Sequence, residues 1–264
     1  MAAEWERRSE LNARSTSHID EWLVDSIDPA DGDTVLDLAA GTGEAGFAAA
    51  SRIGQAGHLI SSDFSPEMVR AAERAGKGLG LTNAEFRVLD AEDLDLTDDS
   101  VDGVLCRFGL MIFPDPGRAL AEIRRVLRDG GRFACATWGP RDKNPWMTTS
   151  AGIVIERGLM EPPGRDGGPG QFSMPDAQTV EPLFKAAGFE SITTETIEVA
   201  WRFESADELW GFASELQGPI SAAISELGPE DQLDVRRELE ERARPFAEGD
   251  GYALPGLAVN TVAS

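Results

Sequence analysis

VLDLAAGTGEAG, at residues 35–46, is the stretch that decides the fold of this chain. It opens with an apolar run around Asp37 that is typical of a buried strand. A tight glycine-rich turn follows, and the small residues from Glu44 to Ile53 then favour a helix. Glycines allow positive φ angles and a close approach of a ligand to the backbone, and a helix N-terminus offers free N–H groups. The stretch therefore predicts a binding site for a nucleotide-type cofactor.

The glycines also match the pattern G-x-G-x-x-G, with Gly41, Gly43 and Gly46, which is typical of dinucleotide-dependent dehydrogenases. Asp37 argues against a dinucleotide, because a carboxylate at the end of the strand would repel a pyrophosphate on the same turn. The acid suits a ligand with a positive end, such as the ammonium and sulfonium groups of S-adenosylmethionine. The plain alternative is a strand–helix turn whose glycines serve packing alone.

With Asp37 included, residues 35–46 resemble motif I of the class I S-adenosylmethionine-dependent methyltransferases. Two later stretches resemble the ubiquinone/menaquinone C-methyltransferase-like group, also called type 11: VDGVLCRFGLMIFPDP at residues 101–116 and ALAEIRRVLRDGGR at residues 119–132. The resemblance covers about residues 30–138. After Phe-Gly-Leu the quinone enzymes carry a polar pair, whereas this chain has Met111 and Ile112, which speaks against methylation of a quinone ring.

Composition and charge narrow the class of protein. The 264 residues are 41% hydrophobic, enough for one large α/β domain or one domain with a small cap. The formal net charge of −23 would repel nucleic acid phosphates and an anionic membrane surface, so we expect neither as a partner. No apolar run reaches membrane-spanning length, and residues 1–11 lack the core of a signal peptide. Cys106 and Cys135 lie in apolar runs, so we expect buried thiols in a reducing cytoplasm and no metal site.

Strands and helices alternate along residues 28–138. The expected strands are residues 34–38, 58–62, 84–89, 101–107 and 132–137, and helices are expected to begin after the caps Ser65 and Asp115. This alternation predicts an α/β fold with a doubly wound, mostly parallel, Rossmann-like sheet. Residues 28–138 would form the cofactor-binding core, with ligands at the carboxyl ends of the strands. Residues 1–27 would form an N-terminal helical lid of one or two helices, broken near Ser15–Ser17.

The pattern changes after Trp138. Helices are expected at residues 145–157, 176–187, 205–216 and 230–243, with a long loop at residues 161–170. The resemblance implies a seven-stranded sheet that ends in an antiparallel strand pair, which would be residues 189–203 and 252–263. The helical insertions within residues 139–264 would then form a substrate cap on one continuous domain.

The resemblance also implies which residues bind S-adenosylmethionine. In the first loop these are Asp37, Ala39, Gly41, Thr42 and Gly43.

At the second strand end, Asp63 would accept hydrogen bonds from the ribose hydroxyls, because a carboxylate suits a vicinal diol; a helix cap is the alternative role. Phe64 would cover one face of the adenine, and Met68 would add apolar contact or belong to the core.

Two further strand ends complete the expected cofactor site. Asp90 and Ala91 would bind the adenine edge, although Glu92 and Asp93 offer neighbouring acids. Arg107 would line the methionine half, because an arginine in an apolar strand needs a partner. The cofactor carboxylate or Asp37 could supply that partner.

Few residues suggest themselves as a catalytic base. Methyl transfer is an in-line displacement at an activated carbon, so the protein mainly positions the acceptor. His18 is the candidate base, with a surface histidine on a helix as the alternative. Phe108, Met111, Trp138 and Trp146 predict an apolar or aromatic substrate pocket, unless they belong to the core.

The sequence thus predicts a methyltransferase that acts on oxygen, nitrogen or carbon of a small, largely apolar or aromatic molecule, as in secondary metabolism. We expect a monomer or homodimer. The alternatives are a non-catalytic cofactor-binding regulator or scaffold of the same fold and, behind these, a nicotinamide-dependent oxidoreductase.

Overall fold

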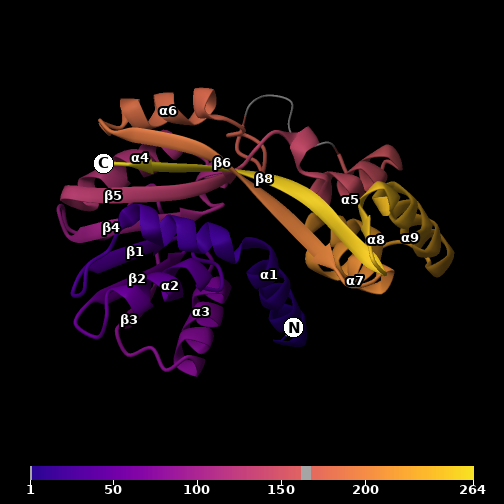
Figure 1. Ribbon diagram of the computed structural model, residues 1–264, viewed down its shortest axis with the longest axis horizontal. Helices are drawn as coiled ribbons and strands as arrows, with labels where there is room; N and C mark the ends of the chain where they lie inside the picture. The colour runs from indigo at the N-terminus through magenta and orange to yellow at the C-terminus, as the bar shows by residue number, and fades with distance from the viewer. Residues whose placement is uncertain (1, 162–167) are drawn as a thin grey trace. The chain divides into compact units, whose positions relative to one another are not determined.

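The computed structural model describes the backbone of residues 2–161 and 168–264, and side chains from residue 10 onward in these ranges. The chain forms two compact units (Figure 1). The sheet unit comprises residues 18–138, 168–197 and 258–264, and the helical unit comprises residues 1–17, 139–167 and 198–257. Helix α1 (Ala2–Ile27) and strands β6 (Ile192–Phe203) and β8 (Gly251–Ala263) contribute residues to both units.

The sheet has the strand order β3-β2-β1-β4-β5-β8-β6, and the short strand β7 (Ala247–Glu248) pairs with β8. Its other members are β1 (Thr34–Leu38), β2 (His58–Asp63), β3 (Ala84–Val88), β4 (Val101–Arg107) and β5 (Leu127–Trp138). The pairs among β1 to β5 are parallel, and β8 runs antiparallel to β5. The predicted mostly parallel, Rossmann-like sheet is therefore confirmed. Its central strand β1 is buried along four of five residues, as expected for a parallel strand covered on both faces.

Helices cover both faces of the sheet unit. Helix α2 (Glu44–Arg52) packs on the face that carries Asp37, and α3 (Pro66–Gly78) packs beside it over β2 and β3. The second half of α1 lies on this same face, because a side chain at Gly103 of β4 would collide with Ile27. Helix α6 (Ala177–Ala186) covers the opposite face through the stacked rings of Phe133 and Phe184, with α4 (Pro116–Val126) against it.

The predicted helix starts agree with the structure. Ser65 accepts a hydrogen bond from the Met68 N–H at the start of α3, and Asp115 accepts one from the Arg118 N–H at the start of α4. Each cap is followed by proline at the first helical position.

Three local predictions were wrong. Helix α1 is continuous through Ser15–Ser17, because the Thr16 hydroxyl bonds to the Asn12 carbonyl within the helix instead of ending it. Strand β5 begins at Leu127, five residues before Arg132, and its register against β4 shifts between these two residues. The helix expected at residues 205–216 is α7 (Ala206–Gly211) followed by a π-helical turn (Phe212–Leu216).

The helical unit contains α5 (Pro145–Glu156), α7, α8 (Pro219–Ser225) and α9 (Pro229–Ala243). Helix α8 was not predicted from the sequence. The core of the helical unit contains an aromatic cluster. Trp146 stacks on Trp201 at 4.3 Å between ring centroids, with Phe212 beside both. Of the loop expected at residues 161–170, residues 162–167 lie outside the described residues.

Candidate functional site

The loop after β1 brings backbone N–H groups and a buried acid together. Gly41 and Gly43 have φ angles of 58° and 97°, and a side chain at Gly43 would collide with the ring of Phe47. Gly43 caps α2 without a side-chain hydrogen bond, so the start of the helix is left to backbone groups. A Cβ at Gly41 would meet nothing within 4 Å, so the loop is open on that side. The predicted glycine-rich turn therefore has the conformation that glycine permits.

Asp37 lies directly beneath this turn and is buried, with 1% of its surface exposed. Its Oδ2 accepts a hydrogen bond of 2.8 Å from the Gly46 N–H, whereas Oδ1 has no partner. Burial raises the pKa of the Asp37 carboxyl to about 7, although the Arg107 charge and the Gly46 hydrogen bond oppose that rise.

Arg107, at the end of β4, is held by two acids from other elements. Its Nη1 lies 3.0 Å from Oδ2 of Asp20 on α1, and its Nη2 lies 2.8 Å from Oε2 of Glu44 on α2. The sequence predicted a partner for Arg107 but named the cofactor carboxylate or Asp37. Asp37 acts on Arg107 electrostatically, but Asp20 and Glu44 are the closer acids. Asp20 carried no sequence signal, since it lies 87 residues from Arg107 within an amphipathic helix.

The ends of β1 and β4 approach each other closely. Ala39 and Phe108, the first residues after these strands, have φ angles of 53° and 58°, which are uncommon for residues other than glycine. A side chain at Gly109 would come within 2.6 Å of the Ala39 Cβ and 2.8 Å of the Cys106 sulfur. Strained backbone of this kind is often found at binding sites, so this edge of the sheet is the strongest candidate for one.

Asp63 connects the first loop to the second. Its Oδ2 accepts a hydrogen bond of 3.0 Å from the Gly41 N–H, and its Oδ1 accepts one of 2.9 Å from the Ser65 N–H. The side chain is partly exposed, and each oxygen keeps a lone pair for a further donor. Phe64, the next residue, is 75% exposed, although a phenylalanine of this size is normally buried. Met68 is half-buried one turn into α3.

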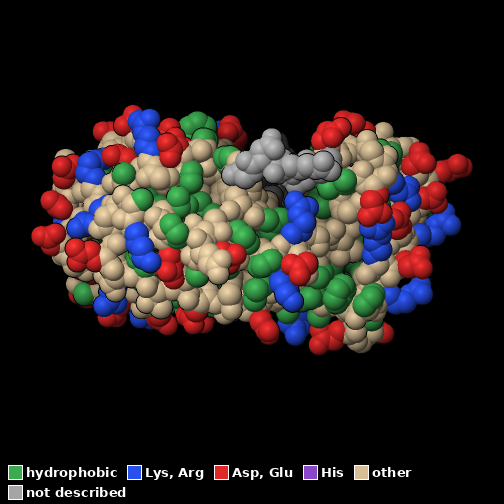
Figure 2. Space-filling model, turned by 90° about the horizontal axis from the view of Figure 1, so that it is seen from above, with side chains coloured by type: hydrophobic (Ala, Val, Ile, Leu, Met, Phe, Trp, Pro, Cys, Tyr) green, Lys and Arg blue, Asp and Glu red, His purple; other side chains and the backbone are tan. Residues whose placement is uncertain are grey.

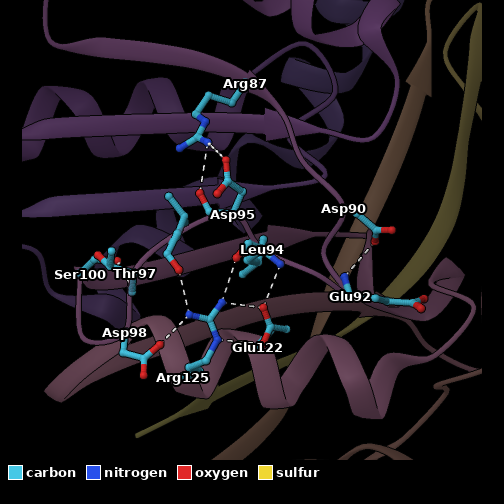
Figure 3. Close-up of polar contacts among 11 residues, drawn as sticks. Arg87, Asp90, Glu92, Leu94, Asp95, Thr97, Asp98, Ser100, Glu122 and Arg125 are labelled. Carbon is cyan, nitrogen blue, oxygen red and sulfur yellow. Dashed lines mark hydrogen bonds and ion pairs between the residues drawn. The ribbon is translucent and has the colours of Figure 1, made fainter.

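The loop after β3 carries Asp90 and Ala91. Asp90 is exposed and its Oδ1 accepts a hydrogen bond from the Glu92 N–H, whereas Ala91 is buried (Figure 3).

Arg125 on α4 holds the loop that follows, and the sequence did not single it out. Its five N–H donors all have acceptors, shown in Figure 3: the Leu94 and Leu96 carbonyls, Asp98, and both oxygens of Glu122. The Leu94 N–H in turn donates to Glu122 at 2.8 Å. Helix α4 thereby fixes the segment that continues from Asp90 and Ala91.

Three of the four predicted pocket residues lie together in the sheet unit. The rings of Phe108 and Trp138 stack at 4.0 Å between centroids. The backbone N–H of Trp138 donates to the Met111 sulfur at 3.4 Å. Met111 and Trp138 are buried, whereas Phe108 is half-buried. Trp146 lies in the helical unit, in the core formed with Trp201 and Phe212.

His18, the candidate base, is exposed on α1 and belongs to the sheet unit.

Within the residues that the structure describes, no group of three or more His, Cys, Asp or Glu side chains could hold a metal ion. None of the described helices combines the length and apolar character needed to span a bilayer. Cys106 and Cys135 are both buried, and burial raises the pKa of each thiol.

A separate cavity of about 350 Å³ lies within the helical unit. Its apolar wall is formed by Leu11, Phe212 and Leu216, and its polar wall by acidic residues around Arg14. Arg14 forms ion pairs with Glu204 and Glu208 there. None of the residues predicted for the site lines this cavity.

Comparisons with known proteins match the part of the chain that contains the loops after β1, β2 and β3. Residues 29–156 match a family model described as a methyltransferase domain. This part of the chain is therefore similar to S-adenosylmethionine-dependent methyltransferases. It is 39% identical over 108 residues to a demethylmenaquinone methyltransferase of Clavibacter sepedonicus, a match that covers 41% of this chain and 42% of the relative. It is 35% identical over 112 residues to the aklanonic acid methyltransferase DauC of a Streptomyces species, covering 42% of this chain and 51% of the relative.

The chain thus spans about half the length of the curated relatives that it matches. The similarity in fold extends further: the structure of YcgJ from Bacillus superposes with a TM-score of 0.63, at 17% identity, over 94% of this chain and 97% of that protein.

S-adenosylmethionine is the cofactor of methyltransferases that the chain resembles, and the chemistry of the site fits it. The buried oxygens of Asp20 and Asp37 that lack partners are acceptors for a cationic group. Asp63 offers acceptors near a loop that is open at Gly41. A pyrophosphate would instead face the Asp37 carboxylate, so the predicted preference over a dinucleotide agrees with the site.

Proposed function

We propose that this protein transfers the methyl group of S-adenosylmethionine to a small, largely apolar or aromatic acceptor. The observation that carries the proposal is the combination of the open glycine loop with an excess of buried acid at the ends of β1 and β4. When bound, the cofactor supplies a methyl group that is already activated for displacement. The protein therefore has to bind, orient and shield, and it needs a base only where the acceptor must lose a proton.

The proposed roles of the residues follow their places in the loops. Asp63 would accept from the ribose hydroxyls, and the exposed ring of Phe64 would cover the adenine. Asp90 and the Ala91 N–H would bind the adenine edge. Asp37 and Arg107 would bind the amino-acid end of the cofactor, between the ends of β1 and β4.

The charge of the surface supports a small molecule as the acceptor. The net charge is −23, and Figure 2 shows Asp and Glu side chains distributed among Lys and Arg over the face that it displays. Such a surface disfavours polyanionic partners. The two curated relatives are named for different small molecules, demethylmenaquinone and aklanonic acid, so the resemblance supports the class of acceptor and not one compound.

We further propose that the helical unit selects the acceptor, as the cap expected within residues 139–264 would do. Its cavity of about 350 Å³ is within the size range of small-molecule sites. A volume-conserving change, Leu216→Met, should then alter KM for the acceptor and leave the affinity for S-adenosylhomocysteine unchanged. An unchanged KM would contradict this role.

The test of the proposed function is titration calorimetry with S-adenosylhomocysteine and, separately, with NAD. We expect S-adenosylhomocysteine to bind and NAD to show no heat. The matched variants are Asp63→Ala and Asp93→Ala, both in loops at the same sheet edge. The first should lose about 1.5–3 kcal/mol of binding free energy, the range for hydrogen bonds to a charged group, and the second should lose little. Equal losses would remove Asp63 from the site.

Activity is tested by release of S-adenosylhomocysteine from S-adenosylmethionine in the presence of candidate aromatic and apolar acceptors. Cofactor binding without release, across such a panel, would favour a regulator or scaffold of the same fold. Tight NAD binding with no response to S-adenosylhomocysteine would instead favour an oxidoreductase.

A further inference from the structure

The acidic cluster around Arg107 carries more negative than positive charge. It contains Asp20 of α1, Asp37 of β1 and Glu44 of α2, with Arg107 of β4 as its cation. When all four groups are ionised, their formal charge is −2. A buried excess of this size is costly unless a further cation or donor reaches it.

The unused hydrogen-bonding capacity of the cluster is on Asp20 and Asp37. Oδ2 of Asp20 binds Arg107 and Oδ2 of Asp37 binds Gly46, whereas Oδ1 of each is buried and has no partner. Asp20 and Asp37 are 6% and 1% exposed, so bulk water does not readily supply the missing donors. In keeping with an incomplete site, burial raises the pKa of both carboxyls, to about 6 and about 7.

The chemistry of the missing group can be deduced, on the basis of the proposed function. S-adenosylmethionine has two cationic groups, a sulfonium and an α-ammonium. A sulfonium has no N–H or O–H donor, whereas an ammonium has three donors and a full charge. Unpartnered carboxylate oxygens need donors, so the ammonium is the group that satisfies them.

We propose that Asp20, through its Oδ1, binds the α-ammonium group of the cofactor, which makes helix α1 part of the cofactor site. Asp37 offers the second oxygen, and Arg107 holds Asp20 in place from the opposite side of its carboxylate. In this arrangement α1 is anchored to the sheet unit both by Ile27 over Gly103 and by Asp20 at Arg107.

The experiment uses titration calorimetry on the full chain and on two variants, Asp20→Asn and Glu21→Gln. Glu21 is exposed on the same helix, so its variant removes one charge without touching Arg107. The three ligands are S-adenosylmethionine, S-adenosylhomocysteine and 5′-methylthioadenosine. The last has the adenosine and the sulfur but lacks the amino-acid end, and its binding also reports whether each variant is folded.

We expect Asp20→Asn to weaken binding of the first two ligands by about tenfold or more, the effect of one lost hydrogen bond between charged groups. Binding of 5′-methylthioadenosine should change by less than about twofold, and Glu21→Gln should leave all three affinities within that range.

Several results would overturn the assignment. Equal weakening of all three ligands by Asp20→Asn would indicate a general structural effect. Weakening of S-adenosylmethionine alone would assign the carboxylate to the sulfonium, and no weakening would remove Asp20 from the site. If the unaltered chain bound none of the three, the proposed function itself would fail, and the role of Asp20 with it.

Discussion

Arg107, at the end of β4, and Arg125, near the start of that strand, are both surrounded by acids, but only one of them has all its neighbouring polar groups partnered. All five donors of Arg125 have acceptors in the structure, two of them backbone carbonyls of the loop that it holds. Around Arg107 the acids outnumber the cation, and two buried carboxylate oxygens have no partner. A complete network fixes a loop, whereas an incomplete one in a buried place indicates a group that is still to bind. The comparison therefore supports the proposal that Arg107 is part of a binding site, whereas Arg125 has a structural role.

The largest expected effect comes from Arg107→Met. Removing the cation leaves Asp20, Asp37 and Glu44 facing one another, and loss of one partner of a buried ion pair typically costs about 3–5 kcal/mol. The free energy of unfolding, measured by urea titration followed by circular dichroism, should fall by that amount at pH 8. It should fall less at pH 5.5, where these acids can take up protons. Arg74→Met, on the exposed face of α3, is the control and should have little effect. An equal loss at both pH values would show that packing, and not charge, is what Arg107 supplies.

Asp20→Asn should change the free energy of unfolding in the opposite direction as pH rises. Because burial raises the folded-state pKa of Asp20 from 3.8 to about 6, the ligand-free protein loses stability as pH rises from about 4 to about 6, where the folded state must give up a proton. The variant lacks that loss. The difference in free energy of unfolding between the variant and the unaltered chain should therefore move in favour of the variant across this window, by about 3 kcal/mol at 1.36 kcal/mol per pKa unit, whatever the pH-independent effect of losing the contact with Arg107.

The check is a series of urea titrations from pH 4 to pH 8, without ligand. The advantage of Asp20→Asn should be nearly constant above pH 6.5, and Glu21→Gln, which leaves the Asp20–Arg107 pair in place, should change the pH dependence much less. If the advantage instead declined as pH rose, Asp20 would be stabilised in its charged form, and the cluster would be as complete as that of Arg125.

The cluster around Arg107 could be predicted from the sequence in part. The glycine turn and Asp37 are contiguous, so one stretch of twelve residues predicted the strand, the turn and the buried acid together. Arg107 was predicted to need a partner because it ends an apolar strand. Asp20 could not be identified, because the pattern of an amphipathic helix shows which residues are buried but not which strand they face.

Arg125 escaped prediction for a similar reason. It lies in a run of charged residues on α4 that is typical of a solvated helix face, and its acceptors at Leu94 and Leu96 are backbone carbonyls, which have no sequence signature. The strand order was easier, because alternating strands and helices permit few arrangements. Ser15 and Thr16 are buried within the continuous helix α1, and residue propensities, which do not include burial, therefore predicted the wrong break there.

Arg125→Lys tests the complete network. Lysine has three donors where arginine has five, so at least two hydrogen bonds are lost. Because Arg125 is partly exposed, the free energy of unfolding should fall by about 1–2 kcal/mol. Hydrogen exchange of the amide of Leu94, which donates to Glu122, should become faster. Arg124→Lys, on the adjacent position of α4, is the control. An unaltered exchange rate at Leu94 would mean that Glu122 holds the loop without Arg125.

The smallest effect is expected for Asn260, in the middle of β8. Asn260 is fully buried, and neither its Nδ2 nor its Oδ1 has a hydrogen-bond partner. It lies in the same row of the sheet as Arg107, because Ala136 pairs with Arg107 on one side and with Asn260 on the other. Unlike Asp20, it carries no charge. Leucine is similar in shape to asparagine but has no polar group. If the Asn260 amide binds nothing, Asn260→Leu removes a buried unpaired amide and should raise the free energy of unfolding by about 1 kcal/mol.

Thr261→Val is the matched contrast to Asn260→Leu. Thr261 is equally buried on the next position of β8, but its hydroxyl lies 3.2 Å from that of Thr194. Loss of that bond should lower the free energy of unfolding by about 1 kcal/mol, the opposite direction. The same urea titrations measure both variants. If Asn260→Leu also destabilised the chain, the Asn260 amide would have a partner, such as an ordered water. Asn260 would then resemble Arg125, as a polar group whose hydrogen bonds are satisfied.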